Sequence, residues 1–294
     1  LWVRTYYSEY DRKEIDASLK KIYTILHSDG GNDTIPFLNV DAIDYCTFGN
    51  SKPFRIKIRN ILNDNYTYFY VKKADASRIY GLELEHILSP HNMNFLVYKD
   101  TLIEEHISGI PGDDFIKEFL PKCSESEKSQ IAKEFVKFKE RCLVRLLGDM
   151  RSYNYVIIPT HDFDKIIYKI RAIDFDQQSF EGNLKVYNLQ FLKENFKIVE
   201  MVNRKLDNNS INQYKLEERS FMAKRMISSP RRASSLIECM KNDSISFDHN
   251  IQLLKKQLIK YVGDVKFKEC QNMGDILETI LVFVKRNYQD VLTK

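Results

Sequence analysis

The sequence lacks the features that mark a secreted, disulfide-bonded or membrane-spanning protein. Its 294 residues include five scattered cysteines, an odd number, and no Cys-x-x-Cys pair. This pattern argues against a disulfide framework and against a zinc site, and the six histidines show no metal-ligand spacing. No apolar run approaches the roughly 20 residues of a membrane-spanning helix, and no signal-peptide pattern is present. A reducing cytoplasm is therefore the expected location, with no membrane partner.

Glycine, proline and net charge are also low. Ten glycines and seven prolines leave little room for disordered linkers. The formal charge of +4 is small and spread along the chain, so it does not indicate a nucleic-acid partner. With 43% hydrophobic and 29% charged residues, the chain can bury one or two cores.

The residues that carry chemistry gather in one segment. Asp149 precedes Asn154 by five positions, and Asp174 and Asp176 follow after two strand-like stretches. An aspartate can orient or deprotonate a hydroxyl, and amide and carboxylate oxygens are ligands that Mg²⁺ prefers. This spacing is typical of a phosphotransferase catalytic loop followed by its metal-binding aspartate. Taken alone it is weak, because Asp and Asn are also common turn residues.

The surrounding pattern strengthens the motif. Apolar residues at helical spacing predict a helix over 129–147 that ends at the loop. Residues 155–158 and 165–170 predict two strands, and 159–162 predict the turn between them. A helix, an acidic loop, a β-hairpin and a further Asp-Phe pair therefore follow one another.

This arrangement resembles the protein-kinase-like superfamily, in particular its atypical branch of aminoglycoside phosphotransferases, choline kinases and HipA-like kinases. The shared residues are Gly148-Asp149, Asn154 and Ile173-Asp174-Phe175-Asp176. Leu147 stands where that branch usually has histidine, and Asp176 stands where protein kinases have the glycine of Asp-Phe-Gly. No Ala-Pro-Glu segment follows, so an ordinary activation loop is not indicated. The resemblance covers about residues 45–290.

The resemblance implies an α+β fold with two lobes, a small β-rich N-lobe and a larger, mostly helical C-lobe. It also implies ATP and Mg²⁺ as cofactors. Asp149 would be the catalytic base or would orient the acceptor hydroxyl, and Arg151 would neutralise charge on the moving phosphoryl group. Asn154, Asp174 and Asp176 would be the metal ligands.

An N-lobe should precede the motif, and a predicted hairpin at 54–58 and 66–71 ends in Lys72-Lys73. It resembles the strand whose lysine holds the nucleotide phosphates. Lys72 is favoured because strand alternation then turns Phe69 and Val71 to the core, although Lys73 remains an alternative. Taken in isolation, both are more often solvated lysines at a strand end.

A helix is predicted over 76–88, ended by Pro90, and it contains Glu83 and Glu85. The resemblance implies that one of these glutamates pairs with the strand lysine. Glu83 fits better, because Ile87 and Leu88 follow it as apolar residues do in the phosphotransferase pattern. A solvated helix face is the competing explanation.

Two further nucleotide contacts are expected from backbone groups. The stretch 104–109 is similar to a kinase hinge, in which the backbone of Glu105 and Ile107 would pair with adenine. An ordinary exit from a strand explains it equally well. The stretch 45–53 has a single glycine, and its Asn50 and Ser51 could present N–H groups to phosphate as a short lid.

The expected domains are an N-terminal elaboration at 1–44, an N-lobe at 45–107 and a C-lobe at 108–294. The elaboration contains a strand near residues 2–7 and a helix at 15–26. The C-lobe is predicted to be helical after Gly182, with helices at 187–206, 213–227, 232–241, 249–262 and 273–288.

Three functions are compatible with these residues: an ATP-dependent kinase of a small molecule, a kinase of protein serine or threonine, and a pseudokinase or nucleotide-binding scaffold. The acceptor would in either kinase be a hydroxyl. Retention of Lys72, Glu83, Asp149, Asn154 and Asp174 favours an active enzyme. Leu147 and the single-glycine lid favour the scaffold. The sequence does not separate small-molecule from protein acceptors or indicate an oligomeric state.

Overall fold

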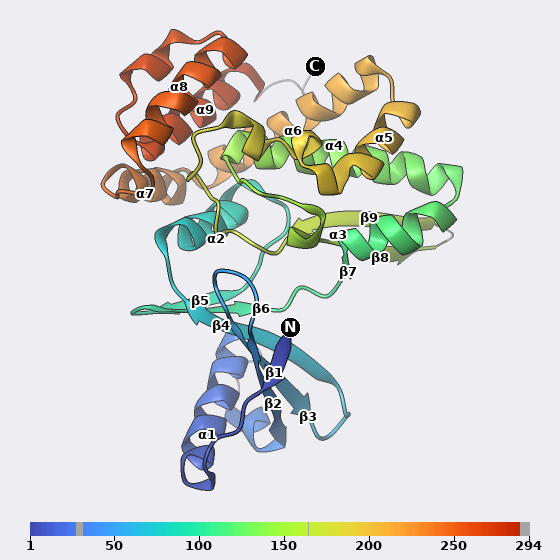
Figure 1. The fold of residues 1–294 in the computed structure, drawn as a ribbon, viewed down its shortest axis with the longest axis vertical. Coiled ribbons are helices and arrows are strands. Elements are labelled where there is room, and N and C mark those ends of the chain that lie inside the picture. The colour runs from blue at the N-terminus through green and yellow to red at the C-terminus, as the bar shows by residue number, and fades with distance from the viewer. Residues whose placement is uncertain (28–31, 164, 289–294) are drawn as a thin grey trace. The chain divides into compact units, whose positions relative to one another are not determined.

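The computed structural model describes residues 1–27, 32–163 and 165–288. The chain divides into two compact units. Unit 1 comprises Leu1–Asp75 and Met93–Ile107, and unit 2 comprises Ala76–Asn92 and Ser108–Lys294. Unit 1 is built on a β-sheet, whereas unit 2 is mostly helical (Figure 1). The predicted α+β fold, with a β-rich part followed by a mostly helical part, is confirmed.

Unit 1 is an antiparallel sheet with one long helix, α1 (Glu9–Leu26), packed on it. Ser8 caps the start of α1 by accepting a hydrogen bond from the Asp11 N–H. Within the described residues the sheet has six strands, in the spatial order β1 (Trp2–Arg4), β2 (Leu38–Cys46), β3 (Phe54–Asn60), β4 (Tyr66–Lys73), β6 (Thr101–Glu105) and β5 (Phe95–Tyr98).

The two faces of this sheet differ because side chains alternate along each strand. Ile56 on β3 lies opposite Phe69 on β4, and both pack with Leu19 of α1 in the core of unit 1. Val71 packs against the same core. Lys72 is therefore on the opposite face of β4.

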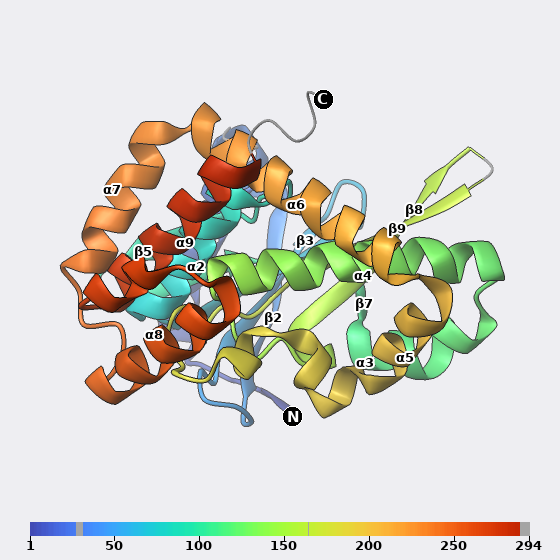
Figure 2. The same ribbon diagram turned by 90° about the horizontal axis from the view of Figure 1, so that it is seen from above.

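Unit 2 is built around α4 (Glu125–Arg145), which packs against α6 (Asn208–Ser228) (Figure 2). A capping box, in which Ser124 and Glu127 exchange side-chain-to-backbone hydrogen bonds, fixes the start of α4. A small sheet, β7 (Ile110–Pro111), β8 (Tyr155–Asp162) and β9 (Lys165–Ala172), packs beside α4. The remaining helices described in unit 2 include α2 (Ala76–Leu88), α3 (Gly112–Asp114), α5 (Phe196–Lys205), α7 (Pro230–Lys241), α8 (Asp248–Val262) and α9 (Met273–Tyr288).

The division of the chain differs from the predicted domains at two places. Strand β2 runs through the expected limit at residue 44, so the N-terminal elaboration and the N-lobe share one sheet. Helix α2 belongs to unit 2, because Leu84, Ile87 and Leu88 join the helical core of that unit. The apolar side of α2 thus decides its unit.

The turn predicted at residues 159–162 is wrong. Residues 159–162 continue strand β8 and do not form a turn. Pro159 pairs with Tyr168 of β9, and β7 contacts β8 only at Val156 and Ile157, so the other side of β8 has no partner strand there among the described residues. A proline lacks an N–H and is tolerated at such an edge.

The helix predicted at 187–206 is shorter than expected. Short 3₁₀ turns occupy residues 184–195, and α5 begins only at Phe196. The side chains of Asn183 and Asn188 accept hydrogen bonds from the N–H groups of Lys185 and Gln190. Such local bonds compete with a continuous helix. None of the described helices is long and apolar enough to cross a membrane.

Candidate functional site

The end of α4 starts the acidic loop. Leu146 adopts the left-handed conformation (φ 58°, ψ 44°) and terminates the helix. The Gly148 N–H then donates to the Gln177 carbonyl at 3.1 Å, and the Ser179 N–H donates to the Leu146 carbonyl at 2.8 Å. The entrance to the loop is therefore held by backbone hydrogen bonds to the segment that follows Asp176.

Asp149 is positioned mainly through its own backbone. Its φ of 53° lies in the left-handed region, which aspartate tolerates better than most residues. Its N–H donates to the Val186 carbonyl at 3.2 Å. Its carbonyl accepts the Arg151 N–H at 2.7 Å and the Asn154 side-chain amide at 2.8 Å. Asp149 and Asn154 are thus joined within one tight turn.

The β8–β9 hairpin brings Asn154 close to Asp174 along the backbone. Tyr155 at the start of β8 pairs with Ala172 at the end of β9, so the residues just outside the ladder are neighbours. The Ile173 N–H donates to the Asn154 carbonyl at 3.0 Å. Because the Asn154 amide nitrogen is used by Asp149, its amide oxygen is the group that can bind a cation.

Asp174 and Asp176 differ in their surroundings. The Asp174 carboxylate accepts the Asp176 N–H at 3.3 Å. The Asp176 carboxylate instead lies 3.4 Å from the guanidinium of Arg78, a buried residue of α2. Arg78 therefore compensates part of the charge of Asp176.

Phe175 fixes this acidic segment against α2. It is buried, and a Cβ placed on Gly81 of α2 would lie 2.8 Å from the Phe175 Cβ. Only glycine allows the helix to approach so closely. The backbone that carries the two aspartates is consequently anchored by the packed side chain of Phe175 between them.

The donor set fits a hard cation that also binds phosphate. The structure has no group of three or more His, Cys, Asp or Glu side chains arranged to hold a metal, as far as residues 1–27, 32–163 and 165–288 are concerned. One amide oxygen and one or two carboxylates are nevertheless sufficient for Mg²⁺, which usually keeps several waters and takes further oxygens from a phosphate substrate.

Arg151 joins two carboxylates. Its Nε donates to Asp149 Oδ1 at 2.7 Å, and one terminal nitrogen donates to Glu194 Oε1 at 2.9 Å. The hydrogen bond to Asp149 raises the pKa of Arg151, so the guanidinium is firmly charged. Glu194 was missed in the sequence because nothing in its local pattern distinguishes it.

A buried network around Arg145 was also missed. Arg145 forms an ion pair with Glu85 and donates to the Gly81 carbonyl at 2.6 Å and to Gln178 at 3.4 Å. Burial is the largest single influence on the pKa of Glu85 and raises it, but the charge of Arg145, a hydrogen bond from Ser89 and the charge of Arg141 together lower the pKa below its usual value. The inward-facing carboxylate of α2 is therefore Glu85. Glu83 instead pairs with Arg232 at 2.7 Å.

In unit 1 the nearly buried lysine is Lys72. Its Nζ lies 2.5 Å from a carboxylate oxygen of Glu104, and the two side chains are only 8% and 2% exposed. Lys73 is exposed. Lys72 pairs with Leu102 across β4 and β6, so Glu104, two residues further, is on the same face. The partner of Lys72 is thus Glu104, whereas a Lys72–Glu83 pair would join the two units and stays a prediction.

The other expected nucleotide contacts lie in unit 1. The Glu105 N–H donates to the Asn94 carbonyl at 3.0 Å, so this N–H is already used within the unit. Ile107 is buried at the end of the unit. Asn50 and Ser51 lie in the turn between β2 and β3, after Gly49, whose φ is +80°. Their roles stay predictions.

Comparison with known proteins adds little to this geometry. No protein-family model and no curated protein matches the sequence. Among solved structures, an ethanolamine kinase from Plasmodium vivax matches with 13% sequence identity and a TM-score of 0.33, covering 88% of this chain and 87% of that one. The assignment of chemistry therefore rests on the side chains of this chain.

Proposed function

We propose that this protein is an ATP- and Mg²⁺-dependent phosphotransferase that acts on a hydroxyl group of a small molecule or a protein. The observation that carries this proposal is the shared end of the β8–β9 hairpin. There Asn154 is bonded to the Asp149 backbone and lies next to the backbone of Asp174. The carboxylate that would orient a hydroxyl and the two side chains that would bind a cation thus come from backbone segments joined at this end of the hairpin.

The transfer is a single displacement. The acceptor oxygen forms a bond to the γ-phosphorus, the bond from that phosphorus to the β,γ-bridging oxygen breaks, and ADP leaves. The hydroxyl proton passes to the Asp149 carboxylate. Arg151 positions that carboxylate at 2.7 Å and carries positive charge beside the moving phosphoryl group.

Mg²⁺ would neutralise charge on the phosphates, and Asp174 and Asn154 would hold it, with Asp176 as a lesser ligand. Asp174 is preferred because Arg78 offsets the charge of Asp176. In unit 1, Lys72 would hold phosphate oxygens of the nucleotide. Its 2.5 Å contact with Glu104 restricts its position.

A nucleotide-binding scaffold is the second candidate. The Asp149 carboxylate is already engaged by Arg151, and Leu147, at the position where histidine is usual, is buried. Both observations favour a protein that binds nucleotide without transferring phosphate. An acceptor hydroxyl would have to share or displace the Arg151 contact.

One experiment separates these functions. Thermal unfolding is followed with and without Mg·ATP, and the protein is then incubated with γ-labelled ATP and candidate hydroxyl compounds. Stabilisation that needs Mg²⁺, together with labelled product that Asp149→Ala lacks, supports the phosphotransferase. Stabilisation without any product, identical for the wild type and Asp149→Ala, supports the scaffold. No stabilisation by Mg·ATP contradicts both.

A further inference from the structure

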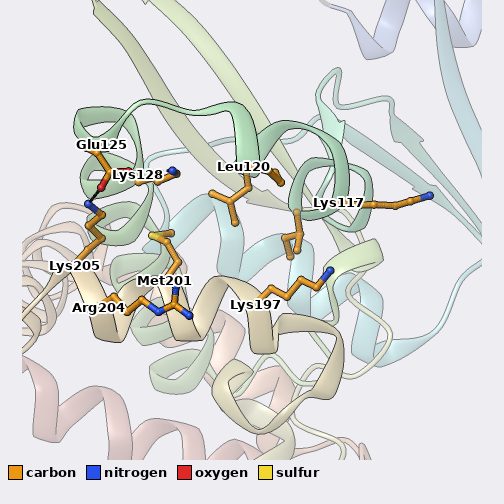
Figure 3. A pocket seen from close by; sticks show the side chains of 10 residues that line it. Lys117, Leu120, Glu125, Lys128, Lys197, Met201, Arg204 and Lys205 are labelled. Carbon is orange, nitrogen blue, oxygen red and sulfur yellow. Dashed lines mark hydrogen bonds and ion pairs between the residues drawn. The ribbon is translucent and has the colours of Figure 1, made fainter.

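Unit 2 contains a pocket between α5 and the turns that precede α4, which we call the α5 pocket (Figure 3). Its volume is about 410 Å³, in the range of small-molecule sites. The residues that line it are Ile116, Lys117, Leu120, Pro121, Glu125, Lys128, Lys197, Met201, Arg204 and Lys205.

The lining of the α5 pocket is strongly cationic. Five of its side chains are lysine or arginine, and Glu125 is its one carboxylate. Glu125 already pairs with Lys128 at 3.0 Å and with Lys205, and Arg204 pairs with Glu200 outside the pocket lining. Within the described parts of the chain, Lys117 and Lys197 form no ion pair. The pocket therefore has positive charge that no neighbouring carboxylate compensates.

The pocket also has an apolar part. Ile116 and Leu120 are buried side chains of the turns before α4, and Met201 of α5 lies across from Leu120 (Figure 3). Lysine and arginine around an apolar patch match a ligand that carries an anionic group next to a hydrophobic group. A small inorganic anion would leave the apolar part unused.

The segments on both sides of the pocket, α5 and the turns before α4, are each preceded by residues that contact the loop carrying Asp149. Just before α5, the Asn195 side-chain amide donates to the Met150 carbonyl at 3.0 Å, and Glu194 pairs with Arg151. The other wall begins at Gly112, where a Cβ would lie 2.4 Å from the Ser152 carbonyl oxygen. Backbone contact this close ties that wall to the same loop.

From these contacts we infer that the α5 pocket binds a small organic anion, with a phosphate or carboxylate beside an apolar group. Given the proposed phosphotransferase activity, on which this step rests, that anion is the phosphoryl acceptor. Lys117 and Lys197 hold its anionic group, and its hydroxyl is directed to the loop that carries Asp149.

Binding can be tested without nucleotide by titrating the protein with phenyl phosphate, and with benzyl alcohol as a neutral probe of similar size. Phenyl phosphate should bind more tightly, and salt should weaken its binding. Lys117→Gln/Lys197→Gln should weaken it by roughly fivefold to tenfold, since each partly exposed charge contributes modestly. Both lysines are exposed, so the folded state should be kept.

A matched control variant changes the net charge equally. Lys185 and Lys260 are also exposed and line a different lysine-rich hollow of about 530 Å³ in unit 2. Lys185→Gln/Lys260→Gln should leave phenyl phosphate binding unchanged. If this variant lowers the affinity as much as Lys117→Gln/Lys197→Gln does, or if phenyl phosphate binds no better than benzyl alcohol, the α5 pocket is not an anion site.

The acceptor step is tested with three compounds that share a ring and a hydroxyl: 4-(hydroxymethyl)benzoate, 1,4-benzenedimethanol and 4-(hydroxymethyl)benzylamine. Labelled phosphate from γ-labelled ATP should go preferentially to the anionic compound, and Lys117→Gln/Lys197→Gln should remove the preference. Preference for the amine overturns the inference. If phenyl phosphate binds in the pocket but no compound is labelled, the anion site stands and the phosphotransferase activity fails.

Discussion

The two units place their chemistry-bearing side chains by different means. In unit 2, backbone hydrogen bonds of one loop and one hairpin set the positions of Asp149, Asn154 and Asp174. In unit 1, Lys72 is positioned by an ion pair with Glu104, which comes from another strand. A position that follows from local backbone geometry can be inferred from spacing, whereas a side-chain partner depends on which strands become neighbours.

The largest effect is expected from the buried ion pair that supports the loop of unit 2. Glu85→Ala leaves the buried Arg145 without its carboxylate, which should lower the free energy of unfolding by roughly 3–5 kcal/mol. Glu83→Ala, on the same helix, breaks only the contact with half-exposed Arg232 and should cost less than about 1 kcal/mol. Urea unfolding measures both. Equal losses would show that Glu85 and Arg145 are not paired in solution.

The next prediction concerns the metal ligands. Asp174→Asn should weaken Mg²⁺-dependent nucleotide binding by about 100-fold or more, and Asp176→Asn by roughly tenfold, because Arg78 already offsets the Asp176 charge. Calorimetric titration with ATP in the presence and absence of Mg²⁺ gives both affinities. Equal losses would make the two aspartates a shared site.

The third prediction concerns Asp149, whose position in unit 2 is set by backbone hydrogen bonds. Asp149→Ala should reduce turnover by roughly 10²-fold or more with little change in nucleotide affinity, because the carboxylate acts on the acceptor. Arg151→Ala should show a similar but smaller loss. Asp162→Ala, an exposed residue at the far end of β8, serves as the control and should leave turnover unchanged. A parallel loss of nucleotide affinity in Asp149→Ala would place the carboxylate at the nucleotide instead.

The fourth prediction concerns Lys72, whose position in unit 1 is set by its ion pair with Glu104. Lys72→Ala and Glu104→Gln should each lower turnover by roughly tenfold, because the lysine loses a phosphate contact or its support. Lys73→Ala should have little effect. Steady-state kinetics compare these variants with Glu83→Gln. If Glu83→Gln is damaging and Glu104→Gln is silent, the working partner of Lys72 is the α2 glutamate that the sequence predicts.

The smallest effect concerns pH. Burial, aided by the charges of Arg141 and Arg171, lowers the pKa of His91 to about 4 from a usual value of 6.5. As the pH falls, His91 is therefore protonated in the unfolded chain before it is protonated in the folded protein. The contribution of neutral, buried His91 to the stability of the fold is present above pH 6.5 and is lost as the pH falls toward 4. The unfolding temperature should drop by a few degrees from pH 7 to 5, and less in His91→Gln. An unchanged slope in that variant would assign the pH dependence to other groups.

Much of the secondary structure could be predicted from the sequence. The helix predicted at 76–88 matches α2 at both ends, and the helix predicted from residue 273 begins with α9, because the apolar spacing of both is regular and Pro90 follows α2. The 3₁₀ turns at 184–195 could not be predicted, because asparagine side chains there bind backbone N–H groups that a helix would use.

The candidate site was predictable only where backbone geometry decides it. The sequence predicted a hairpin between Asn154 and Asp174, and the ladder of β8 and β9 then brings the residues on either side of it together. Glu194, Glu85 and Glu104 were missed as partners, because each is paired with a cation far away in the sequence. Glutamate is common on surfaces, and no local pattern separates these three from solvated ones.

The β8–β9 hairpin has its site at one end, and its other end, where residues 161–163 are exposed, projects beyond the helices of unit 2 (Figure 2). Its ladder pairs Thr160 with Ile167 and His161 with Ile166. Removing these four residues together would shorten the hairpin by two residue pairs without reversing which side chains face inward. The tip is therefore a place where length can vary, or a label can be attached, without altering the spacing of Asn154 and Asp174.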